Sequence, residues 1–99
     1  MPLVTVHQNV VFIEGEHPRA KKKKDAYTRI GGFGAQLRNL NDIKDIMANI
    51  AKQNGCNCVV NFSYGQIHKI ISIDDVLFVG MGKYAILSDV DYNTIVSKL

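Results

Sequence analysis

Cys56 and Cys58 are the residues best suited to bind a metal ion, with His68 further along the same stretch of chain. Thiolates and imidazoles are the ligands that zinc and copper prefer. In an extended segment, side chains two residues apart share one face at a spacing of about 6.6 Å, which disfavours a disulfide between them. Three ligands leave a structural zinc site incomplete, and a free cysteine also packs as a small apolar side chain. We therefore expect reduced, buried cysteines, with soft-metal binding through Cys56, Cys58 and His68 as an alternative.

The densest charge in the sequence is a basic tract between residues 19 and 29. Its six basic residues and one acidic residue, Asp25, give it a net charge of +5, whereas the whole chain carries +3. Such a tract can neutralise phosphates or pair with acidic side chains, and its alternative is a solvated loop without a partner. Only Tyr27 and Phe33 are aromatic nearby, and no RNA-binding signature is present. The candidate residues for binding nucleic acid, another anion or an acidic protein are Arg19, Lys21, Lys22, Lys23, Lys24 and Arg29.

Two further patterns are weaker candidates for a binding or catalytic site. The glycine-rich run at residues 31–34 could present backbone amides to a phosphate, but it lacks the third glycine of a dinucleotide motif and the Lys-Ser/Thr pair of a P-loop. We interpret it as a hinge. Glu14 and Glu16 could form a carboxylate pair, yet no nucleophile motif accompanies them. The sequence therefore predicts neither an enzyme nor a bound cofactor.

The elements predicted in the first half of the chain determine the position of the basic tract. Residues 3–13 are rich in β-branched and aromatic side chains and predict a strand bent near Asn9. The apolar pattern stops from about residue 15 to 34, which predicts a mobile basic loop. Apolar residues then recur at helical spacing and predict a helix over about 40–54, with Asn39 or Asn41 as its cap and Gly55 as its end. The polar side of this helix is formed by Asp42, Lys44, Asp45, Asn49 and Lys52.

The second half predicts extended segments. Residues 56–64 read as a strand with Cys56, Cys58, Val60 and Phe62 on one face, Gly65 begins a turn, and residues 67–73 form another extended segment. Residues 76–87 form the last long strand, in which Gly80 and Gly82 indicate a bulge or a close approach of backbone. Asp91 is expected to cap a short terminal helix.

These segments fit one domain over residues 1–99. A content of 46% hydrophobic and 21% charged residues is typical of a globular chain and argues against disorder. The order of elements predicts an α+β two-layer sandwich, in which a mainly antiparallel sheet carries one main helix and a short C-terminal helix. The longest apolar stretch is too short to span a membrane, and the N-terminus does not resemble a secretory signal, so we expect a cytoplasmic protein.

The run from Asn54 to Tyr64 and the strand end at residues 82–87 resemble the YbjQ-like family, which is often labelled heavy-metal-binding. The resemblance covers about residues 40–88. It implies a small α+β domain that assembles into a ring-shaped homo-oligomer, a pentamer, without an established activity. We therefore expect a non-enzymatic, oligomer-forming domain that binds a partner or a small ligand, with the basic tract as the alternative site of function.

Overall fold

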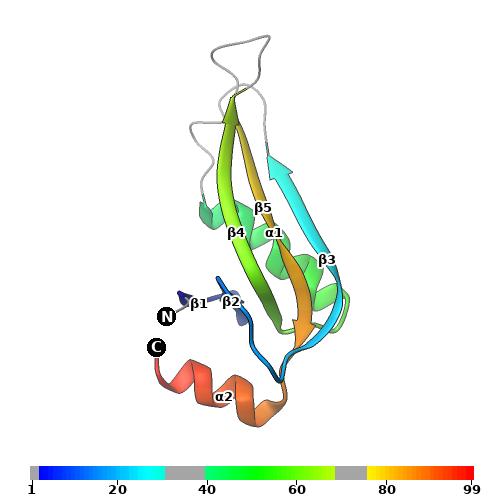
Figure 1. Cartoon of the computed structure of the whole chain (residues 1–99), viewed down its shortest axis with the longest axis vertical. Helices are drawn as coiled ribbons and strands as arrows, with labels where there is room; N and C mark the ends of the chain where they lie inside the picture. The colour runs from blue at the N-terminus through cyan, green and yellow to red at the C-terminus, as the bar shows by residue number, and fades with distance from the viewer. Residues whose placement is uncertain (1–2, 31–39, 69–75) are drawn as a thin grey trace.

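The computed structural model describes residues 3–30, 40–68 and 76–99. In this part of the chain the elements follow the order β1 (Val4–His7), β2 (Val10–Ile13), β3 (Lys21–Ile30), α1 (Leu40–Gln53), β4 (Cys58–His68), β5 (Val76–Ile86) and α2 (Asp89–Ser97). The strands form one sheet in the order β1-β2-β4-β5-β3, in which β2 and β4 are parallel and the other neighbours antiparallel. Helix α1 crosses one face of the sheet, and α2 lies at its lower end (Figure 1). The predicted α+β class is confirmed.

The segment predicted as one bent strand over residues 3–13 forms a hairpin of two strands, β1 and β2. Gln8 and Asn9 have φ angles of 50° and 67°, and they join β1 to β2 in a two-residue turn. Two successive left-handed residues define the type I′ turn, whose twist matches that of the flanking strands. All of β2 is buried, because Val10 and Phe12 pack on the side of the sheet that α1 covers, and Val11 and Ile13 pack on the side that α2 contacts.

The basic tract lies on a strand, so the prediction of a mobile loop over residues 15–34 is wrong for residues 21–30. This strand, β3, pairs antiparallel with β5 along its whole length and forms one edge of the sheet. Lysines are compatible with an edge strand, where long side chains reach water from either face. The glycine run at residues 31–34 lies outside the described residues.

The predicted turn at Gly65 is also wrong. Strand β4 continues through Gly65, which pairs with Val79, and ends at His68. The remainder of the expected segment at residues 67–73 lies outside the described residues after His68. Glycine weakens a strand without preventing its backbone from pairing, so β4 and β5 form one long antiparallel pair.

A bulge interrupts that pair at Asn61. Between the pairs Val60 with Lys83 and Ser63 with Met81, two residues of β4 stand opposite the single residue Gly82 of β5. Asn61 adopts a φ of 54°, and its backbone N–H donates to the carbonyl of Gly15 at 2.8 Å. The bulge inverts the alternation of side chains, because an extra residue moves every later side chain to the other face.

Gly82 is required by this close approach. A Cβ atom at Gly82 would lie 2.7 Å from the carbonyl oxygen of Val60 and 2.9 Å from Val59 Cγ1. A Cβ atom at Gly80 would collide with Ile43 and lie 3.0 Å from Met47 Sδ, so Gly80 lets α1 pack closely on β5. The prediction of a bulge or a close approach of backbone is confirmed at Gly82, whereas Gly80 is approached by side chains of α1.

The helix predicted over residues 40–54 is confirmed as α1, and Gly55 ends it with a φ of 71°. Its apolar side covers the first hydrophobic cluster, which contains Val10, Phe12, Ala26, Ile43, Met47, Ala48, Ala51, Cys56, Val59, Phe62 and Tyr84. The opposite face of the sheet carries a second cluster, on which α2 packs through Tyr92 and Ile95; it contains Val11, Ile13, Cys58, Val60, Ala85 and Leu87. Helix α2 is capped by Ser88, whose hydroxyl accepts from the Asp91 N–H, so the predicted cap at Asp91 is wrong.

Candidate functional site

The basic tract does not act as one cluster. Arg19 forms an ion pair of 2.9 Å with Asp91 of α2, and Lys22 forms one of 2.7 Å with Glu16. Both basic groups therefore already have a partner within the fold. Lys83 of β5, which the sequence analysis did not include, lies 3.7 Å from Asp25.

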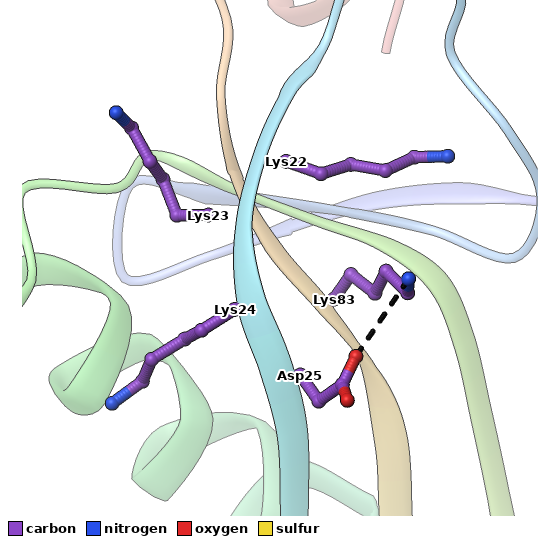
Figure 2. A pocket seen from close by; sticks show the side chains of 5 residues that line it. All are labelled: Lys22, Lys23, Lys24, Asp25 and Lys83. Atoms are coloured by element: carbon purple, nitrogen blue, oxygen red, sulfur yellow. Dashed lines mark ion pairs between the residues drawn. The ribbon is translucent and has the colours of Figure 1, made fainter.

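A second bulge decides where the lysines of β3 point. Lys22 pairs with Ala85 and Lys24 with Tyr84, so Lys23 is an extra residue without a direct partner on β5. Lys21, opposite Ile86, and Lys24 lie on the face of the sheet that carries α1, because cross-strand partners share a face. Figure 2 shows that Lys23 and Lys24 leave β3 on one side. Lys22 leaves β3 on the other side, where Lys83 of β5 also lies.

An open pocket of about 460 Å³ surrounds this point of the strand, lined by Lys22, Lys23, Lys24, Asp25 and Lys83 (Figure 2). Four ammonium groups and one carboxylate give its lining an excess of positive charge. An anionic group is the ligand that such a pocket can hold.

The charges around the pocket are distributed unevenly. The pKa of Glu16 is lowered by hydrogen bonds from Asn61 and Lys22, so this carboxylate stays ionised and compensates Lys22. Asp25 lies 3.7 Å from the Lys83 ammonium group and offsets the charge of that lysine. Lys21, Lys23 and Lys24 have no ion-pair partner among the described residues. Lys24 Nζ lies 6.0 Å from the centre of the Tyr84 ring. These three lysines, which we call the lysine row, are the free charges of the site.

Arg29 lies apart from the lysine row. It is exposed and pairs with Val79 near the other end of β3, on the face opposite α1. The six predicted residues are therefore divided among the lysine row, the ion pairs of Arg19 and Lys22, and this distant arginine.

The two cysteines do not share a face, and that prediction is wrong. Cys56 belongs to the cluster under α1, whereas Cys58 belongs to the cluster on the opposite face. Cys56 precedes β4, in the turn that ends α1, where its N–H donates to the carbonyl of Ala51 at 2.7 Å, so strand alternation does not apply to it. Both thiols are free and buried, as expected.

The cysteines are poorly placed to act as metal ligands. Burial raises the pKa of Cys58 to about 12, and it also raises the pKa of Cys56, which the charges of Lys23 and Lys24 partly oppose. A metal needs the thiolate form. His68 ends β4, but the position of its side chain lies outside the description. Among the described residues, no group of three or more histidine, cysteine, aspartate and glutamate side chains is arranged to hold a metal ion.

Lys44 is a buried cation that sequence reasoning placed on the solvent side of α1. It is 5% exposed, its ammonium group donates to Thr5 Oγ1 at 2.8 Å, and it lies 5.5 Å from the ring centres of Phe12 and Phe62. Burial lowers its pKa. The helical pattern did not indicate that Lys44 is buried, because the hairpin of β1 and β2 that covers it comes from a distant part of the sequence.

Glu14 and Glu16, considered above as a carboxylate pair, interact with different residues. Glu16 bonds to Asn61 and Lys22, whereas the charge of Glu14 acts on Lys44. The two groups serve different neighbours.

Comparison with protein-family models, curated proteins and solved structures finds no match for this chain. The similarity to the YbjQ-like family therefore stays a prediction from residues 40–88. Within the described residues, no helix is both long and apolar enough to cross a bilayer.

Proposed function

We propose that this chain is a non-enzymatic binding domain that holds an anionic partner at the edge of β3. The observation that supports the proposal most strongly is the lysine row, which a bulge gathers on one side of an edge strand without any carboxylate among the described residues to balance it. Like charges in such proximity repel each other, and an anion removes this repulsion.

The paired neighbours support the same proposal. Glu16 and Asp25 compensate Lys22 and Lys83 within the fold, so Lys23 and Lys24 are the pocket-lining lysines without an ion-pair partner among the described residues. A strongly positive, solvent-facing row also attracts anions over a distance of about one Debye length, roughly 10 Å at 0.1 M salt.

The salt dependence of binding tests this proposal. We expect the native protein to bind a single-stranded thymidine decamer, used as a generic anionic probe, with a slope of about −2 in log affinity against log salt if the three lysines each neutralise one phosphate. Fluorescence anisotropy at several salt concentrations gives the slope. A slope near zero would contradict the proposal, as would the failure of every anionic probe, peptide or nucleic acid, to bind at low salt.

A second candidate function is self-association through the face of the sheet opposite α1. Tyr27 of β3 and Met81 of β5 are direct cross-strand partners on this face, and they are 57% and 47% exposed. The adjacent pair, Asp25 and Lys83, offers one charge of each sign, so a second copy could match both the apolar and the charged groups.

Light scattering on a sizing column tests self-association. We expect a mass of a small multiple of 11.0 kDa, which falls toward that of the monomer in a Tyr27→Ser/Met81→Ser variant. A native protein that is monomeric at micromolar concentration would eliminate this second function and leave the lysine row unaffected.

A further inference from the structure

Within residues 3–30, 40–68 and 76–99, no strand pairs with the outer backbone edge of β3, along which the lysine row lies. Strand β3 is the last strand of the sheet and pairs only with β5 in the described part of the chain. None of the backbone hydrogen bonds found outside the regular elements of that part reaches residues 21–30. An edge strand presents unpaired N–H and C=O groups that can form a ladder with another extended chain.

We infer that the anionic partner is an extended acidic polypeptide segment that adds to the sheet as a further strand beside β3. This inference rests on the proposed function and narrows it to one chemical class. The backbone ladder would provide affinity, and the lysine row would select the charge of the segment.

The distribution of charge predicts the pattern of the segment. Side chains of an added strand alternate between the two faces of the sheet. Those on the face of α1 lie beside the lysine row, where carboxylates are favoured. Those on the other face meet Lys22 and Lys83, which Glu16 and Asp25 already compensate. The matching segment therefore has acidic residues at every second position and neutral residues between them.

Nucleic acid fits the same edge less well. Phosphates could contact the lysine row, but they cannot continue the backbone ladder of β3. Single-stranded nucleic acid also gains affinity by stacking on exposed aromatic rings. The ring beside Lys24, Tyr84, is 2% exposed, and Tyr27 lies on the opposite face of the sheet. A second copy of β3 would bring lysines rather than carboxylates to the row.

The test compares three probes on the full chain at low salt by fluorescence anisotropy. They are a decapeptide of alternating glutamate and threonine, the same peptide with every backbone amide N-methylated, and a thymidine decamer. The methylated peptide keeps the charge and loses the N–H donors. We expect it to bind at least about tenfold more weakly than the unmodified peptide, which is the loss that corresponds to about 1.4 kcal/mol.

Amide hydrogen exchange followed by NMR provides the second readout. We expect the unmodified peptide to slow exchange at alternate amides of residues 21–30, whose N–H groups face away from β5. The thymidine decamer should leave these amides unprotected.

The outcomes separate the inference from the function on which it rests. Equal binding of the two peptides, or binding of the thymidine decamer alone, would overturn the added strand while the anion site stands. A second copy found paired along β3 would overturn it too. No binding of any probe at low salt would overturn both.

Discussion

Cys56 and Cys58 lie two residues apart in the sequence but on opposite faces of the sheet, in different hydrophobic clusters. Cys56 is 3% exposed and Cys58 is fully buried. Because the backbone of the sheet separates the two side chains, they cannot bind one metal ion together, and each acts as a small apolar residue of its own cluster.

Both thiols should be unreactive in the folded protein. At pH 8, a thiol with a pKa of about 12 is a thiolate in only about one molecule in ten thousand, and burial further restricts access to Cys58. We expect a chromogenic disulfide reagent to label neither cysteine of the native protein at the rate of a free thiol, and to label both in urea. Rapid labelling of Cys58 in the native protein would contradict its burial.

The same shift predicts a loss of stability in alkali. The pKa of Cys58 is raised in the fold from 9.0 to about 12, so its contribution is fully present below pH 9 and is lost as the pH rises toward 12. A Cys58→Ala variant should show less of this loss when urea midpoints are compared between pH 8 and pH 10.5. An identical decrease in both proteins would assign the alkaline sensitivity to other groups.

Replacing Gly82 by alanine should destabilise the sheet. The new Cβ would lie 2.7 Å from the carbonyl oxygen of Val60, and backbone cannot move aside as a flexible side chain can. We expect a loss of about 2 kcal/mol in the free energy of unfolding, measured by urea denaturation.

Gly65→Ala is the matched control for this change. It lies on the neighbouring strand of the same sheet, and no atom lies within 4 Å of its added Cβ. Its free energy of unfolding should stay within about 0.5 kcal/mol of the native value. Similar losses at both glycines would show that glycine content, and not the close approach at Gly82, determines the stability.

The bulge at Asn61 can be tested by two substitutions that remove the same side chain. Asn61→Ala and Asn61→Gly both lose the hydrogen bond to Glu16, but only alanine must hold a Cβ at a φ of 54°. We expect the glycine variant to be the more stable by about 1 kcal/mol in urea denaturation. An alanine variant as stable as the glycine variant would contradict the left-handed conformation at this residue.

Asp45 links α1 to the first hairpin and should make the fold sensitive to acid. Hydrogen bonds from His7 and Gln8 hold the pKa of Asp45 below its usual value of 3.8. A carboxyl with a lowered pKa stabilises the fold above its usual pKa, and this stability is lost as the pH falls through the lowered value. The urea midpoint should therefore fall less between pH 4 and pH 2 in Asp45→Asn than in the native protein. An equal fall would place the acid sensitivity elsewhere.

The fold could be predicted where a local pattern determines the structure. Helix α1 has a continuous apolar side and a glycine at its end, so its bounds follow from residues 40–55 alone. Strand β3 could not be found in this way, because four consecutive lysines conceal the alternation that identifies a strand. The turn at Gln8 was also hidden, since glutamine rarely adopts a positive φ.

The candidate site could be predicted in its residues but not in its arrangement. The lysines are evident in the sequence, yet their division depends on Glu16, Asp91 and Lys83, which the fold brings to them from other elements. The bulge that gathers the lysine row exists only in the pairing of β3 with β5. Sequence spacing carries no signal for such long-range contacts.

The most direct test of the anion site compares two double variants that remove the same charge. Lys23→Gln/Lys24→Gln removes two members of the lysine row. Arg19→Gln/Lys98→Gln removes two basic groups elsewhere, of which Arg19 pairs with Asp91 of α2. Affinity for the alternating glutamate and threonine decapeptide is measured at low salt by fluorescence anisotropy. We expect the first variant to lose at least about tenfold in affinity and the control to lose less than about threefold. Equal losses in both variants, or none in the first, would contradict an anion site at the edge of β3.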